Sequence, residues 1–250
     1  MKTIILLLAL LSLSACEQFD VPQAQTQACA PNAYVTHPKN QTYLNELQQY
    51  RRNTGSPGSL LLIQKPGEAR WVGTVGQANL EHQTDIQVCS PFRVGSITKM
   101  FTAVAVLKLQ ERGQLRLDDK LAQLLPQTAG RIPQAEGITV RQLLNHTSGI
   151  VDPPNESIQY QLSIVDNAQE RFKMTTEQLL SRYVYGKPLH FLPGSGWRYS
   201  NTNYWLLGQI IERKTGKQLH DVFSEWIFRP LNLTDTYLEV RDDRNVVRGY

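Results

Sequence analysis

The stretch from Ser96 to Arg112 constrains the fold most, because a Ser-Ile-Thr-Lys sequence leads there into a run of apolar residues. Residues at positions i and i+3 share one face of a helix, so Ser96 and Lys99 are expected on the same face, at the helix start. Apolar residues surround Lys99 on every side of this helix, which predicts a helix buried all round. Burial would favour the neutral amine of Lys99, which can act as a base. The alternative is an N-cap serine followed by a lysine that reaches the surface.

Strand patterns precede this helix and helical patterns come after it. Ser59–Gln64 and Ala69–Gly76 are predicted to form a β-hairpin that turns at Pro66-Gly67. The other expected helices are Tyr43–Arg52, Val140–Leu144, Thr176–Tyr183, Thr202–Lys214 and Leu219–Phe228. Strands followed by helices favour an α+β fold over an alternating α/β one.

The N-terminus has the pattern of a targeting segment. Lys2 precedes the apolar run Ile4–Leu11, and Leu-Ser-Ala-Cys ends at Cys16. The run is too short to span a bilayer as an anchor of the mature protein. Leu-Ser-Ala-Cys resembles the bacterial lipobox, which implies lipidation of Cys16 and anchoring to a cell-envelope membrane, facing the periplasm or the exterior. The alternative is an ordinary signal peptide with a chance cysteine.

The predicted domain organisation rests on these patterns. Residues 1–15 are a lipoprotein signal peptide, and residues 16–40, rich in Gln, Ala, Pro and Asn, are a tether. Residues 41–250 are predicted to form one domain. Its residues 41–112 form the N-terminal part of an α/β region, and residues 113–250 are mostly helical.

The two remaining cysteines, Cys29 and Cys89, would lie in an oxidising compartment that permits a disulfide between them. Two unpaired thiols are the alternative, because separation in sequence says nothing about Cα distance.

Composition excludes several classes of protein. With 41% hydrophobic and 19% charged residues, the chain is not disordered. The net charge of +4 is scattered and has no basic run with interleaved aromatics, so no nucleic-acid partner is expected. Neither the cysteines nor the five histidines have metal-ligand spacing, so neither a metal nor another cofactor is predicted.

Tyr199-Ser200-Asn201 lies after Pro193-Gly194, just before the helix expected at Thr202. A tyrosine beside a lysine can carry protons, and an asparagine can bind both a substrate amide and a lysine ammonium. The alternative is an N-cap asparagine beside a packing tyrosine.

Three ordered segments, Val94–Lys99, Thr139–Gly149 and Pro193–Asn201, carry a family resemblance. Together they resemble the serine β-lactamase and penicillin-binding protein superfamily, above all its class C β-lactamase and D-alanyl-D-alanine carboxypeptidase branch. The resemblance implies an antiparallel sheet flanked by helices, with an inserted, mostly helical subdomain.

The resemblance also implies roles for individual residues. Ser96 would be the nucleophile, Lys99 its base partner, Tyr199 a second proton carrier and Asn201 a ligand of the substrate amide. His146, in Leu-Leu-Asn-His-Thr-Ser-Gly, would fix a loop by hydrogen bonds rather than take part in catalysis.

A third motif of the family, Lys/His-Thr/Ser-Gly on a strand, has no clear match. Lys214-Thr215-Gly216 has the right letters but ends a predicted helix, so it is interpreted as a helix cap. The expectation is therefore a C-terminally truncated chain with an incomplete sheet.

The leading functional hypothesis is a serine hydrolase that forms an acyl-enzyme with a small-molecule or peptide substrate, either a peptidoglycan stem peptide or a β-lactam. An esterase of small acyl esters is one alternative. A catalytically weak or inactive envelope-binding protein is another, because the third motif is missing. The sequence is silent on oligomeric state.

Overall fold

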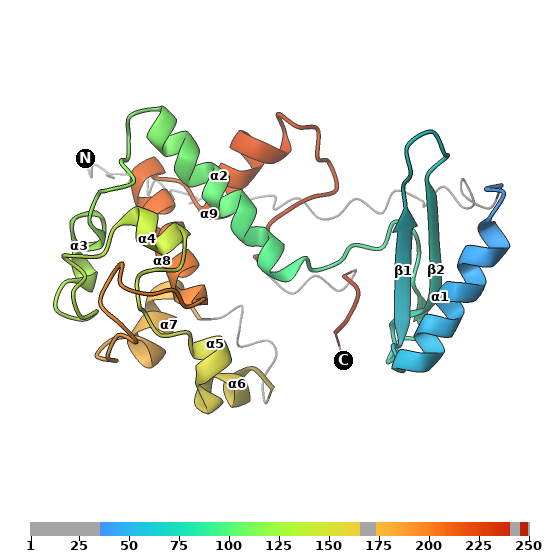
Figure 1. Ribbon diagram of the computed structural model, residues 1–250, viewed down its shortest axis with the longest axis horizontal. Coiled ribbons are helices and arrows are strands. Elements are labelled where there is room, and N and C mark those ends of the chain that lie inside the picture. Colours follow the sequence, from blue (N-terminus) through green and yellow to red (C-terminus); the bar gives the residue numbers. More distant parts are fainter. Residues whose placement is uncertain (1–35, 166–173, 241–245, 250) are drawn as a thin grey trace, which may run out of the picture.

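The computed structural model describes residues 36–165, 174–240 and 246–249 (Figure 1). The predicted signal peptide and most of the tether lie outside these residues. The elements, in chain order, are α1 (Asn40–Thr54), β1 (Gly58–Ile63), β2 (Trp71–Asn79), β3 (Thr84–Asp85), the 3-10 turn η1 (Gly95–Ile97), α2 (Thr98–Glu111), α3 (Leu121–Leu124), the 3-10 turn η2 (Pro126–Thr128), α4 (Val140–Leu144), α5 (Pro153–Glu156), α6 (Ile158–Val165), α7 (Thr176–Tyr183), α8 (Asn201–Thr215), α9 (Leu219–Phe223) and the π-helical turn η4 (Ser224–Phe228).

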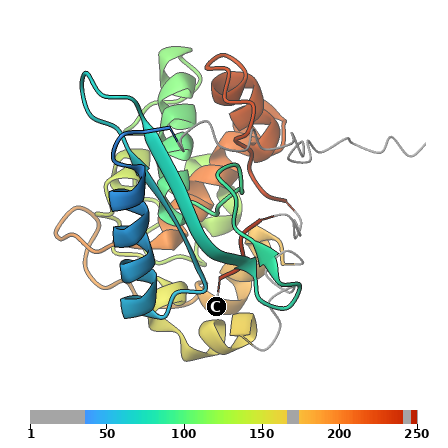
Figure 2. The same cartoon turned by 90° about the vertical axis from the view of Figure 1, so that its right-hand side faces the viewer.

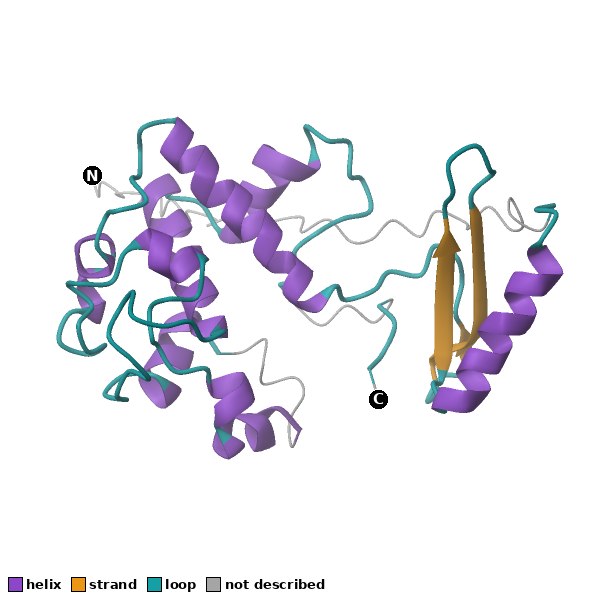
Figure 3. Ribbon diagram, in the orientation of Figure 1, coloured by secondary structure: helices purple, strands orange, loops and turns teal. Residues whose placement is uncertain are grey.

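The α+β prediction is confirmed, because the strands lie in the N-terminal part and the elements after β3 are helical (Figure 3). The predicted hairpin is also confirmed. β1 pairs antiparallel with β2 from Gly58 opposite Gly76 to Ile63 opposite Trp71. β3 adds a short pairing at the end of β2, so the strand order is β1-β2-β3 and β1 lies at the edge of the sheet that the described strands form.

Helix α1 lies along the hairpin (Figure 2). Trp71 is fully buried there, its Nε1 donates to Asn40 Oδ1 at 2.9 Å, and its ring lies 5.2 Å from the Tyr43 ring. Leu47 is also buried, and Gly55 ends the helix in the left-handed conformation (φ +67°). These contacts stabilise a small layer of one helix on the hairpin.

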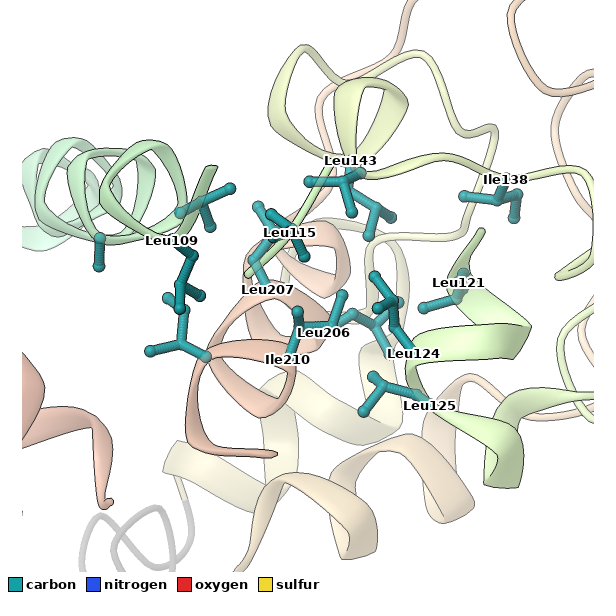
Figure 4. Packing of buried hydrophobic residues seen from close by; sticks show 14 of the residues in the cluster. Leu109, Leu115, Leu121, Leu124, Leu125, Ile138, Leu143, Leu206, Leu207 and Ile210 are labelled. Carbon is teal, nitrogen blue, oxygen red and sulfur yellow. The ribbon is translucent and has the colours of Figure 1, made fainter. Parts of the chain in front are cut away.

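The main hydrophobic core lies between the helices (Figure 4). Leu109 of α2 and Leu206, Leu207 and Ile210 of α8 are fully buried in it. Leu143 of α4 joins the same cluster. This packing fixes α2 against α8, and these two helices carry the residues of interest. Among the described residues, no helix combines the length and the apolarity needed to cross a bilayer.

The prediction that the helix after Ser96 is buried on all sides is wrong. Thr102, Ala105, Val106 and Leu109 of α2 are buried. The opposite face is open, with Met100 61% and Leu107 49% exposed. Apolar composition all round a helix does not determine how many of its faces find a packing partner.

Lys214-Thr215-Gly216 lies at the C-terminal end of α8, as the helix-cap interpretation predicts. Thr215 is the last helical residue, its Oγ1 donates to the Ile211 carbonyl at 2.8 Å, and Gly216 is left-handed (φ +69°). The interpretation of this segment as a helix cap is confirmed.

Candidate active site

Ser96 lies in the 3-10 turn η1, directly before α2, and Lys99 lies in the first turn of α2. Lys99 Nζ donates to Ser96 Oγ at 3.0 Å, so the two side chains share one face, as the spacing predicts. Ser96 is exposed and Lys99 is half-buried. The lysine therefore turns inward to the serine instead of extending along the surface.

Tyr199, in the loop before α8, and Asn201, the first residue of α8, lie beside Ser96 and Lys99. The Tyr199 hydroxyl lies 2.7 Å from Ser96 Oγ, and Asn201 Oδ1 accepts from Lys99 Nζ at 2.7 Å. Lys99 Nζ also lies 5.0 Å from the centre of the Tyr199 ring. The alternative of an N-cap asparagine is wrong, because Ser200 occupies the N-cap position and Asn201 is the first helical residue. All four residues predicted to do chemistry are thus in one cluster.

His146 holds the loop before α8, and its predicted structural contacts are confirmed. Its ring stacks on Tyr199 with centroids 4.6 Å apart, and its Nδ1 accepts from the Ser200 backbone N–H at 3.2 Å. An N–H can only donate, so Nδ1 carries no proton and the neutral ring bears it on Nε2. Burial and the positive charge of Lys99 lower the pKa of His146 below its usual 6.5, against a smaller opposing effect of Asp152.

The loop after His146 is paired with the loop before Tyr199. Backbone hydrogen bonds run from Arg198 N to His146 O at 3.0 Å and from His190 N to Gly149 O at 2.8 Å. Gly149 has φ +80°, and a Cβ there would lie 2.3 Å from the Phe191 carbonyl oxygen. Only glycine fits this position without a shift of the backbone.

Asp152 belongs to the same cluster and was not predicted from the sequence. It is only 2% exposed, and its Oδ1 accepts from both the backbone N and the side-chain Nδ2 of Asn201, each at 3.0 Å. One local signal existed, because Asp152 comes after the apolar pair Ile150-Val151 and precedes Pro153-Pro154, as a residue at a helix start does.

Glu156 joins this region to the loop before α8. It accepts from Arg198 Nε at 2.8 Å, from the Asp152 backbone N at 3.1 Å, and contacts His190 Nε2 at 2.9 Å. Although partial burial opposes it, these hydrogen bonds lower the pKa of Glu156. Helix α5 is therefore held beside the site by a charged carboxylate.

The predicted cysteine sites are only partly described. Cys89 is disulfide-bonded. Cys16 and Cys29 lie outside the described residues, so the pairing of Cys29 with Cys89 and the lipidation of Cys16 stay predictions. Within the ranges that the structure describes, no group of three or more His, Cys, Asp or Glu side chains gathers as metal ligands would.

Ser96 is surrounded by groups of the kind that activate a serine nucleophile. A hydroxyl lies within hydrogen-bonding distance of an amine and of a phenol, and each of these can take or return its proton. Asn201 orients the amine from the other side.

Comparison with known proteins agrees with this geometry. Residues 45–249 match the family model described as Beta-lactamase. The chain belongs to the Beta-lactamase family. Among curated members, it is 32% identical over 184 residues to "Penicillin-binding protein 4*" of Bacillus subtilis, and 32% identical over 183 residues to "Esterase EstB" of Burkholderia gladioli.

Solved structures of the family superpose on the chain. A D-stereospecific amidohydrolase from Streptomyces is 35% identical with a TM-score of 0.64, covering 76% of this chain and 54% of that one. A D-amino acid amidase from Ochrobactrum anthropi is 28% identical with a TM-score of 0.65, covering 84% and 55%. The family and its fold, predicted from the motifs, are confirmed. The class C branch stays a prediction.

The chain spans less than half the length of these curated relatives. The matches cover 70% and 71% of this chain, but 37% of the penicillin-binding protein and 46% of the esterase.

Proposed function

We propose that this chain is a serine hydrolase of the Beta-lactamase family that works through an acyl-enzyme. The observation that carries the proposal is the position of Ser96 Oγ, 3.0 Å from Lys99 Nζ and 2.7 Å from the Tyr199 hydroxyl. A nucleophile within reach of two proton carriers is what acyl transfer requires.

In the proposed reaction, Ser96 Oγ attacks a carbonyl carbon while its proton passes to the neutral amine of Lys99, either directly or through the Tyr199 hydroxyl, which gives up its own proton as it takes that of Ser96. The backbone N–H of Ser96 is the proposed donor to the oxyanion. The tetrahedral intermediate collapses as the leaving nitrogen or oxygen takes a proton, which leaves an ester on Ser96. Water then attacks this ester, its proton takes the same route in reverse, and the free serine is restored.

For the substrate, we propose amides of the D-alanyl-D-alanine type or β-lactams. Support comes from relatives whose names state a penicillin-binding protein and a D-stereospecific amidohydrolase. A small acyl ester is the second candidate, supported by the relative named as an esterase.

The proposed location is the outer side of a bacterial membrane, with a lipid on Cys16. Its support is the Leu-Ser-Ala-Cys sequence after a short apolar run. Metabolic labelling with an alkyne fatty acid tests it, because label on the protein and none on Cys16→Ala is expected.

Covalent labelling with a fluorescent penicillin tests the acyl-enzyme. We expect label on the wild type, none on Ser96→Ala, and full label on Ser181→Ala, which alters an exposed serine of α7. Absence of any acyl adduct by mass spectrometry, with penicillins, D-amino acid amides and nitrophenyl esters alike, would overturn the proposal.

Turnover separates the substrates. Release of D-alanine from a D-Ala-D-Ala peptide would identify a peptidase, and rapid opening of a chromogenic cephalosporin would identify a β-lactamase. Hydrolysis of nitrophenyl esters alone would identify an esterase.

A further inference from the structure

Asp152 is a buried carboxylate directly behind the site. It precedes α5 and contacts α8, where its Oδ1 receives two hydrogen bonds from Asn201 and its Oδ2 accepts from Asn155 Nδ2. A buried charge needs such partners. The first N–H groups of α8 also favour a negative charge at this point. These hydrogen bonds hold the Asp152 carboxylate in place beside Asn201.

The amide of Asn201 lies between an N–H donor and a carboxylate. Its Oδ1 accepts from Lys99 Nζ at 2.7 Å, and its Nδ2 donates to the Asp152 carboxylate at 3.0 Å. A flipped amide would place its oxygen against the Asp152 carboxylate, which is a repulsive contact, and its NH₂ against the N–H groups of Lys99 Nζ. The two ends of a carboxamide have almost the same shape, so packing alone would not choose between these orientations.

We propose that Asp152 is a positioning residue of the acylation step, and the proposal rests on the proposed function. Asp152 orients Asn201 so that Oδ1 faces Lys99, and Asn201 in turn keeps Lys99 Nζ at 3.0 Å from Ser96 Oγ. Its carboxylate accepts hydrogen bonds from Asn201 and Asn155 and from neither Ser96 nor Lys99, so its hydrogen-bonded route to the reacting groups passes through Asn201.

A matched control separates this role from a structural one. Thr202 Oγ1 donates to the Val151 carbonyl at 2.8 Å, so it joins the same two segments without contacting the Asn201 amide. Asp152→Ala removes two hydrogen bonds between α8 and the loop before α5, and Thr202→Val removes one. Both variants are expected to melt at a lower temperature than the wild type.

The rate of acylation by a penicillin, or by a nitrophenyl ester if only esters react, is the first measurement. We expect Asp152→Ala to slow acylation by about tenfold to 100-fold, the range that misplacement of a reacting group produces. Asp152→Asn keeps an oxygen acceptor and is expected to recover part of the rate. Thr202→Val is expected to stay within about twofold of the wild type.

A double-mutant cycle tests whether Asp152 acts through Asn201. In an Asn201→Ala background, Asp152→Ala is expected to slow acylation no further. Equal fold-losses in both backgrounds would overturn the proposal, as would an equal loss in Thr202→Val.

A second readout does not depend on any reaction. In ¹⁵N-edited spectra, the Asn201 side-chain NH₂ is expected to give two well-separated, slowly exchanging proton signals. These should collapse in Asp152→Ala and persist in Thr202→Val, and unchanged signals in Asp152→Ala would overturn the proposal. If the wild type forms no acyl adduct, the proposed function fails, while these spectra still decide whether Asp152 orients Asn201.

Discussion

Tyr199 uses its ring and its hydroxyl for different contacts. The ring stacks on His146 and faces Lys99, whereas the hydroxyl meets Ser96 Oγ at 2.7 Å. Tyr199→Phe keeps the ring contacts and removes only the proton carrier. We expect the acylation rate to fall by about 10²–10⁴-fold, the usual contribution of general acid–base catalysis, with almost no change in melting temperature.

Tyr204→Phe is the matched control for Tyr199→Phe. The Tyr204 ring also faces Lys99, at 5.6 Å, but its hydroxyl donates to the Leu144 carbonyl and not to Ser96. Similar acylation rates in both variants would show that the Tyr199 hydroxyl transfers no proton during acylation.

His146 makes stability depend on pH. Its pKa in the folded chain is lowered below 6.5, so the unfolded chain binds more protons between the two values. The stability that the neutral ring contributes is fully present above pH 6.5 and is lost as pH falls through the folded-state pKa. Protonation would also break the bond that Nδ1 accepts from Ser200.

NMR titration of the His146 ring measures this directly, and a midpoint at or above 6.5 would contradict the prediction. His146→Asn is the matching variant, because asparagine tolerates the left-handed backbone found here (φ +62°) and does not titrate. Its unfolding free energy, monitored from pH 7 to pH 5, is expected to fall less than that of the wild type.

At the scale of single elements, the loop between α4 and α5 depends on one glycine. Gly149 and Gly186 both have left-handed backbones, but only a Cβ on Gly149 would collide with another backbone, at Phe191. Gly186→Ala is expected to cost about 1–2 kcal/mol from the left-handed conformation alone. Gly149→Ala should cost clearly more and should also slow acylation, because the paired loops carry His146 and lead to Tyr199.

Urea unfolding of the two glycine variants checks this difference. Equal losses of unfolding free energy would mean that the loops separate easily at Phe191 and that their pairing contributes little.

Elements and site residues differ in how far the sequence predicts them. The hairpin and helix α8 are predictable from local periodicity and from Gly216, and the Ser96–Lys99 pair is predictable from helical spacing. Tyr199 and Asn201 come from a distant segment, so their position beside Lys99 depends on the packing of α2 against α8, and the family motifs indicated it. Asp152 was missed because an aspartate before a proline has the same local pattern whether it caps an exposed helix or is buried.

At the scale of the whole molecule, some residues are buried outside the main hydrophobic cluster. Leu47 and Trp71 are buried between α1 and the hairpin, whereas the main cluster joins α2, α4, α8 and their neighbours. The prediction that α2 is buried on all sides failed on its exposed side. A sequence gives the polarity of each helix face, but it does not show whether another element packs against that face. Only the tertiary arrangement determines which faces are covered.

The edge position of β1 has a consequence for the behaviour of the chain in solution. β1 reads Gly-Ser-Leu-Leu-Leu-Ile, with neither the charge nor the proline that commonly protects an edge strand, and Leu62 is 50% exposed. Such an edge is a template for a strand of another molecule. We therefore expect sedimentation velocity to detect self-association that increases with concentration.

Leu62→Lys should weaken this association, whereas Leu231→Lys, at a 65% exposed leucine outside the sheet, should not. Sedimentation that is independent of concentration, or equally altered by both variants, would contradict the prediction that the β1 edge causes self-association. If Leu62→Lys alone weakens the association, the solubility of the chain is limited by backbone amides of β1 that have no partner among the described strands.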